Sequence, residues 1–193
     1  MFELETLTAP ELERLIAGGV SVAVVPFGSI EHQGAHLPLG ADAMLADAVG
    51  REVARRLGAV LAPTVRVGDA QQHRARTGTI TLRTETLTEV AVEVAESLTR
   101  QGFTLVVLAS THGGNRAALD AAVARLGVSA CAPRGDVGPH PGAHSGEWLT
   151  SVMRALRPDL VAGDESHGER GARHFERYVA GIVAGARAAE AQL

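Results

Sequence analysis

The chain has 193 residues with 22 acidic and 18 basic side chains, which gives a formal net charge of -4. Every basic residue is an arginine, and the absence of lysine excludes Schiff-base catalysis, covalent pyridoxal phosphate and a phosphate-loop lysine. An acidic chain with 3% aromatic residues lacks the basic, ring-bearing surface that nucleic acids need, and the single cysteine, Cys131, excludes a disulfide framework and a thiolate zinc cluster.

The length favours a single domain over residues 1–193 that buries its own core. The N-terminus is acidic and no run of about 18 apolar residues occurs, so neither a signal peptide nor a membrane span is expected. These features predict a soluble, cytoplasmic protein with no membrane partner.

Apolar periodicity and turn residues divide the chain into alternating helices and strands. In chain order they predict a helix at 9–18, a strand at 20–25, a helix at 43–57, a strand at 59–67, a weakly alternating segment at 77–82, a helix at 84–101, a strand at 103–109, a helix at 115–126, a strand at 128–132, a Gly/Pro-rich loop at 133–142, and helices at 147–156 and 171–191. This alternation over short connections predicts a three-layer α/β/α sandwich with a mainly parallel sheet.

Two polar loops follow two of the predicted strands. Residues 26–42 carry two carboxylates and two imidazoles, and residues 110–115 carry another histidine beside two glycines. Carboxylate oxygen and neutral imidazole nitrogen are the usual ligands of zinc, manganese and iron(II), and ligands of open α/β sheets bind beyond the carboxyl ends of the strands. The loops therefore predict a metal site at one edge of the sheet. The alternative is a polar loop that only covers the sheet edge.

The first loop resembles that of the creatininase family, also called creatinine amidohydrolases. Members share a strand followed by the pattern Gly-Ser-x-Glu-Gln-His-Gly-x-His-Leu-Pro-Leu-x-Thr-Asp. The positions that match it are Gly28, Ser29, Glu31, Gly34, His36, Leu37, Pro38, Leu39 and Asp42. Further similarity is found at Gly78-Thr79-Ile80, His112-Gly113-Gly114-Asn115 and His144-Ser145-Gly146. The resemblance covers residues from about 20 to 161 and implies a creatininase-like fold.

The resemblance also implies two divalent metals that share a bridging aspartate. Carried over by position, Asp42 would bridge, and Glu31 and His112 would complete the first metal site. Gln33 and Leu149 stand where the family has a histidine and a glutamate for the second metal. We therefore expect one site for zinc, manganese or iron, with the second site weakened or absent. Asp42 could alternatively only cap the helix that follows it.

Other side chains are expected near this site. By resemblance, His144 would pass a proton to the leaving nitrogen, a task that suits an imidazole, and Glu147 is a further catalytic candidate. Candidate contacts to the metal ligands or the substrate are His32, Gln33, His36, His73, Asn115 and Trp148. His36 could instead be a structural loop histidine, and Trp148 a core residue. The remaining histidines are expected at the surface or in loops; they are His140, His167 and His174.

Together these features predict a metal-dependent amidohydrolase that hydrolyses a C–N bond of a small cyclic or linear amide through a metal-activated water. The main alternative is a non-catalytic protein of the same fold with a degraded metal centre, which acts as a binding or subunit-interaction module. A nucleotide-binding domain is disfavoured because no phosphate-cradling glycine pattern follows the first strand. The expected partner is a small-molecule amide. Homo-oligomerisation stays open, because the chain is shortened between Val161 and Gly171 relative to the hexameric family members.

Overall fold

A parallel sheet lies at the centre of the protein. The structure is a computed structural model that describes residues 1–138, 144–163 and 168–193. Its strands, in the spatial order β1-β3-β2-β4-β5, are β1 (Phe2–Glu3), β2 (Val22–Phe27), β3 (Val60–Leu61), β4 (Leu105–Ser110) and β5 (Ala130–Cys131). Each pair of neighbouring strands is parallel. Apolar residues dominate β2 and β4, as expected of strands that are buried on both faces.

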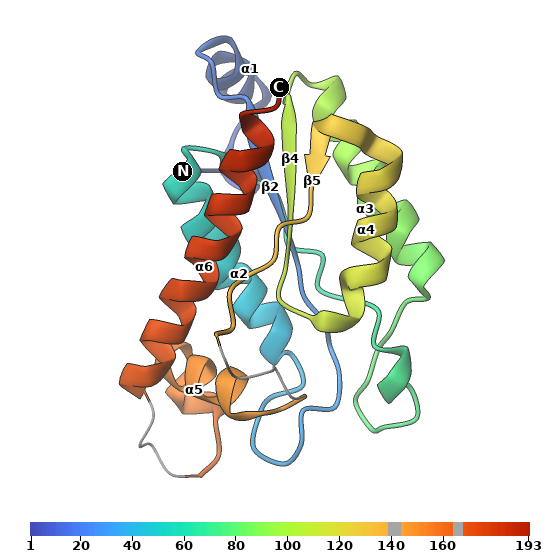
Figure 1. Ribbon diagram of the computed structural model, residues 1–193, viewed down its shortest axis with the longest axis vertical. Coiled ribbons are helices and arrows are strands. Elements are labelled where there is room, and N and C mark those ends of the chain that lie inside the picture. Colours follow the sequence, from blue (N-terminus) through green and yellow to red (C-terminus); the bar gives the residue numbers. More distant parts are fainter. Residues whose placement is uncertain (139–143, 164–167) are drawn as a thin grey trace.

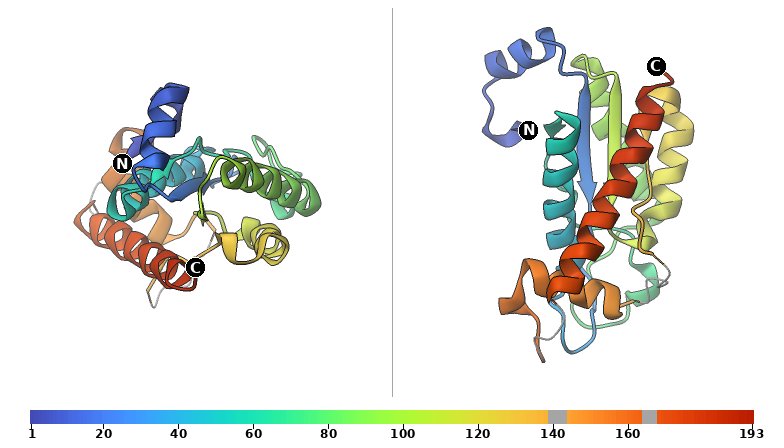
Figure 2. Two further views of the ribbon diagram at one scale, coloured as in Figure 1. Left: turned by 90° about the horizontal axis from the view of Figure 1, so that it is seen from above. Right: turned by 60° about the vertical axis from the view of Figure 1, so that its left-hand side comes forward.

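Helices cover both faces of this sheet (Figures 1 and 2). They are α1 (Ala9–Ala17), α2 (Ala41–Leu57), α3 (Thr84–Arg100), α4 (Arg116–Leu126), α5 (Glu147–Leu156) and α6 (Gly168–Glu190). Helices α2, α5 and α6 form one core with Val24 and Val107, whereas α3 and α4 form a second core with Val25 and Leu108. Two cores result because alternate residues of a strand point to opposite faces. The predicted three-layer α/β/α fold with a parallel sheet is confirmed.

The chain between α2 and α3 contains less strand than its apolar residues suggest. The strand expected at 59–67 is limited to β3, because Pro63 has no N–H to donate and the chain beyond it meets β2 only at a bridge between Phe27 and Val65. The segment at 77–82 forms no strand and makes one isolated bridge, from Ile80 to Ile30.

Smaller differences concern the ends of elements. A 3-10 turn at Gly127–Ser129 replaces the start of the strand expected at 128–132. Helix α6 begins at Gly168, before the expected residue 171, and β1 was not predicted. The expected loop at 133–142 lies outside the described residues beyond 138. Among the described helices, none combines the length and the apolar composition that crossing a bilayer requires.

The carboxyl ends of β2 and β4 lie side by side. Phe27 pairs in register with Ser110, so the loops that follow the two strands leave the sheet at the same edge, as predicted. The start of α2 packs against this edge because Gly28 has no side chain: a Cβ there would lie 2.4 Å from the Cα of Ala43. This close approach brings the first turn of α2 to the two loops.

Candidate metal centre

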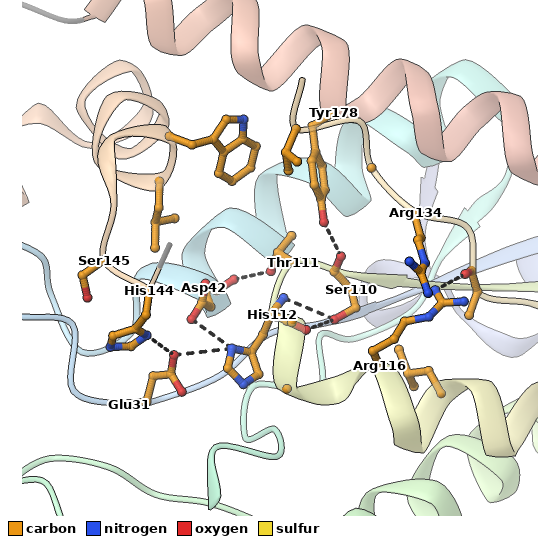
Figure 3. A pocket seen from close by; sticks show the side chains of 18 of the residues that line it. Glu31, Asp42, Ser110, Thr111, His112, Arg116, Arg134, His144, Ser145 and Tyr178 are labelled. Carbon is orange, nitrogen blue, oxygen red and sulfur yellow. Dashed lines mark hydrogen bonds and ion pairs between the residues drawn. The ribbon is translucent and has the colours of Figure 1, made fainter. Parts of the chain in front are cut away.

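Three buried side chains meet at this edge of the sheet. Nδ1 of His112 lies 3.4 Å from Oε1 of Glu31 and 3.5 Å from Oδ2 of Asp42 (Figure 3). The exposed fraction is 8% for His112, 1% for Glu31 and 4% for Asp42. Ligand atoms around a tetrahedral zinc ion lie about 3.4 Å apart, because each bond is about 2.0–2.1 Å long. The spacing and the donor types therefore fit one divalent ion, and the structure brings together the three predicted ligands.

The sequence positions these groups from three different segments. Glu31 lies in the loop after β2, Asp42 in the first turn of α2, and His112 after β4. The Thr111 hydroxyl donates a hydrogen bond of 2.7 Å to the backbone carbonyl of Asp42, which ties the second loop to the helix. The helix is capped by Gly40, so the alternative role of Asp42 as its cap is wrong: its carboxylate points to the centre.

A backbone carbonyl fixes the imidazole of His112. Its Nε2 lies 2.9 Å from the carbonyl oxygen of Asp69, which only accepts, so Nε2 carries the hydrogen and the Nδ1 lone pair faces the two carboxylates. The Asn115 side chain holds that carbonyl in place, accepting from the Asp69 N–H at 2.9 Å and donating to the Gly28 carbonyl at 3.0 Å. Asn115 thus positions His112 indirectly.

Two carboxylates and an imidazole nitrogen that face one another favour a proton or a cation between them. Burial raises the pKa of the Glu31 carboxyl to about 7, with the negative charge of Asp42 adding to the rise and His112 opposing it. Burial lowers the pKa of His112, but the hydrogen bond that its protonated form makes to Asp42 and the two negative charges outweigh this and raise the pKa. Metal-free protein therefore holds protons where a divalent cation can replace them.

The Gln33 side chain lies between the two carboxylates. Its Nε2 donates to Oδ2 of Asp42 at 2.7 Å and to Oε1 of Glu31 at 3.2 Å, and the residue is 1% exposed. The Ser145 hydroxyl donates to Oε1 of Gln33 at 2.9 Å, which fixes the orientation of the amide. Leu149 lines the same cavity without a donor. A neutral amide thus bridges two acidic groups at a sequence position where the resemblance implied a histidine ligand of the second ion.

Two further histidines lie in the cavity beside Glu31. Nδ1 of His144 is 3.3 Å from Oε1 of Glu31, and its Nε2 is 2.6 Å from the carbonyl oxygen of His32. The ring of His73 lies with its centroid 3.9 Å from that of His144. One ligand atom each from Glu31, His73 and His144 form a second group that could hold a metal ion.

Several predicted residues lie away from the centre. Glu147 begins α5, does not line the cavity and forms an exposed ion pair with Arg170, so the geometry does not support its predicted catalytic role. His36 does not line the cavity either, and its Nε2 lies 2.9 Å from the Thr150 hydroxyl. The side chain of His32 accepts from the Gly34 N–H at 3.3 Å, outside the cavity lining.

Trp148 and the remaining histidines were also assigned positions from the sequence. Trp148 is buried and lines the cavity, so it is both a core and a wall residue. His174 lies in α6 rather than in a loop and is half-buried, with its Nδ1 2.9 Å from the Ser151 hydroxyl. His140 and His167 lie outside the described residues.

The cavity above the centre has a volume of about 690 Å³. Sequence reasoning did not identify two of the residues that build it. Tyr178 of α6 forms a wall and donates its hydroxyl to the Ser110 carbonyl at 2.6 Å, and the side chain of Arg134 reaches the cavity at the end remote from Glu31 (Figure 3). No spacing pattern links either residue to the two loops, so the sequence carried no signal for them.

These features define an α/β protein with a candidate metal centre of two carboxylates and one imidazole at the carboxyl edge of a parallel sheet. Comparison with known proteins agrees with that class. Residues 5–191 match the family model for creatininase, described as creatinine amidohydrolase. The chain therefore belongs to the creatininase family.

Similar proteins within this family are named for two different activities. The mycofactocin precursor peptide peptidase of Mycobacterium ulcerans (strain Agy99) is 36% identical over 157 residues, which cover 73% of this chain and 60% of the relative. The creatinine amidohydrolase of Pseudomonas putida is 29% identical over 187 residues, 80% of this chain and 72% of that protein. A crystal structure of creatinine amidohydrolase has a TM-score of 0.77 at 26% identity and covers 94% of this chain and 95% of that chain. The chain thus spans about 60% of the length of the Mycobacterium ulcerans relative.

Proposed function

We propose that the protein is a metal-dependent amide hydrolase, in which Glu31, Asp42 and His112 hold one zinc, manganese or iron(II) ion. The observation that carries this proposal is the spacing of 3.4 and 3.5 Å from Nδ1 of His112 to the two carboxylates, together with the carbonyl that turns the imidazole lone pair toward them. When bound there, such an ion supplies Lewis-acid chemistry, lowering the pKa of a water molecule and polarising an amide carbonyl.

His144 is the proposed proton donor to the leaving nitrogen. Its Nε2–H is held by the His32 carbonyl, so Nδ1 is the atom that gains and loses a proton beside Oε1 of Glu31. With 31% of its side chain exposed, His144 lies at the open part of the cavity, where a substrate can approach it. An imidazole in this position can protonate the amine that departs when the C–N bond breaks.

The proposed substrate is a small amide, either cyclic or a short peptide. A cavity of about 690 Å³ is within the range of small-molecule sites and admits a few residues of an extended peptide. The printed names of the relatives refer to a precursor peptide in one case and to creatinine in the other. Both are compounds in which a C–N bond beside a carbonyl can be hydrolysed.

The alternative is a binding or subunit-interaction module that has lost its activity. The amide of Gln33 favours it, because this group already satisfies both carboxylates without a metal. Against it stands the cost of keeping two carboxylates and an imidazole buried together, which is large unless the groups are paired or bind an ion.

Metal analysis combined with an activity assay separates the two proposals. Protein freed of metal by a chelator is titrated with Zn²⁺ or Mn²⁺, and hydrolysis of creatinine and of short peptides is followed by the release of product. We expect wild-type protein to retain at least about one ion through desalting and to hydrolyse an amide, and the His112→Ala variant to lose both properties. Glu13→Gln, an exposed change in α1, is the matched control and should lose neither. Wild-type protein that binds no ion would contradict the hydrolase; bound metal without hydrolysis of any amide would favour the binding module.

A further inference from the structure

His112 and His144 are held in the same way on two sides of one carboxylate oxygen. Each donates its Nε2–H to a backbone carbonyl, of Asp69 at 2.9 Å and of His32 at 2.6 Å. Each directs Nδ1 at Oε1 of Glu31, at 3.4 and 3.3 Å. A ring nitrogen fixed by a carbonyl on its far side is the usual arrangement of a metal-binding histidine. His144 therefore has the geometry of a ligand, although it lies outside the first group.

His73 supplies a third group on this side of the cavity. It lies in the 3-10 turn Gln71–His73, and its ring is tilted by 32° against that of His144 at a centroid distance of 3.9 Å. Its Nδ1 is buried and has no hydrogen-bond partner in the part of the chain that the structure describes. Ligand atoms of Glu31, His73 and His144 lie within 4.8 Å of one another.

The donor types of this second group suit a divalent cation. Two imidazoles and a carboxylate are ligands of zinc, and also of manganese and iron(II). The group shares only Glu31 with the first one, and its two histidines are more exposed than Asp42 and His112. A second ion would thus bind on the open side of the cavity.

We propose that Glu31, His73 and His144 bind a second divalent ion, and that this ion inhibits the enzyme. Binding through Nδ1 of His144 removes the atom that carries the proton for the leaving nitrogen, so the inhibition rests on the proposed function while the binding does not. Side chains at this site are more exposed than at the first, where all three are buried, so the second ion binds more weakly. Excess metal then switches the hydrolase off.

Isothermal titration calorimetry of metal-free protein with Zn²⁺ tests the binding. We expect wild-type protein to bind about two ions in a tight and a weaker step, and His73→Gln to lose only the weaker step and bind about one. His144→Gln should show the same loss. His36→Gln is the matched control, because it removes an imidazole outside the cavity and should leave both steps intact. Wild-type protein that binds one ion, or a His73→Gln variant that still binds two, overturns the site.

An activity assay at increasing Zn²⁺ tests the inhibition. Wild-type activity should rise up to the first equivalent and fall as the second binds, whereas His73→Gln should rise and then stay level. Wild-type activity that stays level through the second binding step overturns the inhibitory role. If no amide is hydrolysed at all, the proposed function fails, but the calorimetric comparison of wild type with His73→Gln still decides whether the second ion binds.

Discussion

Gln33 donates its side-chain N–H to Asp42 over 2.7 Å, and both residues are buried. The same nitrogen reaches Glu31 at 3.2 Å, so one neutral group relieves the repulsion between two acidic groups. A hydrogen bond to a buried charged group is worth more than one between neutral groups, because an unpaired carboxylate there would be desolvated without compensation. The amide therefore stabilises the metal-free fold.

Replacing Gln33 by methionine keeps the volume and removes the donor. We expect the Gln33→Met change to lower the free energy of unfolding of the metal-free protein by about 1–3 kcal/mol, since two carboxylates lose a donor. Urea unfolding in the presence of a chelator measures this loss. Ser145→Ala, which removes only the hydrogen bond to the opposite end of the amide, should cost less. Equal stability of Gln33→Met and wild type would mean that the amide does not hold the carboxylates together.

The two glycines after His112 should respond very differently to substitution. A Cβ on Gly114 would lie 2.1 Å from the Asp69 carbonyl oxygen and 2.4 Å from Nε2 of His112, so it would separate that hydrogen-bonded pair. A Cβ on Gly113 meets nothing within 4 Å. We expect Gly114→Ala to weaken metal binding about 10–100-fold, as the loss of a group that orients a ligand does, and Gly113→Ala to leave it unchanged. Calorimetric titration of both variants checks this, and similar affinities would contradict the role given to the Asp69 carbonyl.

The arrangement of the main strands could be predicted from the sequence. The apolar runs that became β2 and β4 are continuous, which is typical of strands buried on both faces, and the polar loops after them share an edge because parallel strands end together. By contrast, the strand expected at 59–67 is short, because Pro63 interrupts the ladder, and the two-residue strand β1 is too short to give a periodic signal.

Parts of the site had no signal in the sequence. Asp69 orients His112 through its backbone carbonyl, which any residue type provides, so its identity reveals nothing. Tyr178 lies on an inward position of α6 and reads as an ordinary core residue. Glu147 lies only two residues before Leu149, where the family has a ligand, but the first residue of a helix can point to solvent, and here it pairs with Arg170. Only the folded chain shows which positions of α5 face the cavity.

Cys131 should be unreactive in the folded protein. Burial raises the pKa of its thiol to about 11, because a thiolate in β5, packed against the hydrophobic core, would be poorly solvated. Only about one thiol in a thousand is then ionised near pH 8, and the thiolate is the form that reacts. A disulfide exchange reagent should therefore modify the native protein slowly and the urea-unfolded protein rapidly. Rapid labelling of the native state would show that the thiol is more accessible than this position implies.

Stability of the metal-free protein should fall as the pH rises. The pKa of Glu31 is about 7 in the folded chain against 4.5 for the free group, so the folded state holds this proton more tightly than the unfolded state does. Its contribution is fully present below about pH 4.5 and is lost as the pH rises through about 7, a change of roughly 3 kcal/mol. The pKa of His112 is also raised, so its contribution to the free energy of unfolding likewise falls as the pH rises above its ordinary value of 6.5.

Urea unfolding of chelator-treated protein between about pH 5 and pH 8 measures this loss, because the free energy of unfolding should decrease across the range. The Glu31→Gln variant carries no titrating group at this position, so its stability should depend less on pH than that of the wild type. A saturating divalent ion should also reduce the slope, since Glu31 bound to a cation is ionised throughout. If the free energy of unfolding of the wild type depends on pH no more than that of Glu31→Gln, Glu31 is ionised at neutral pH even without metal. The metal-free centre then holds no proton in place of the ion.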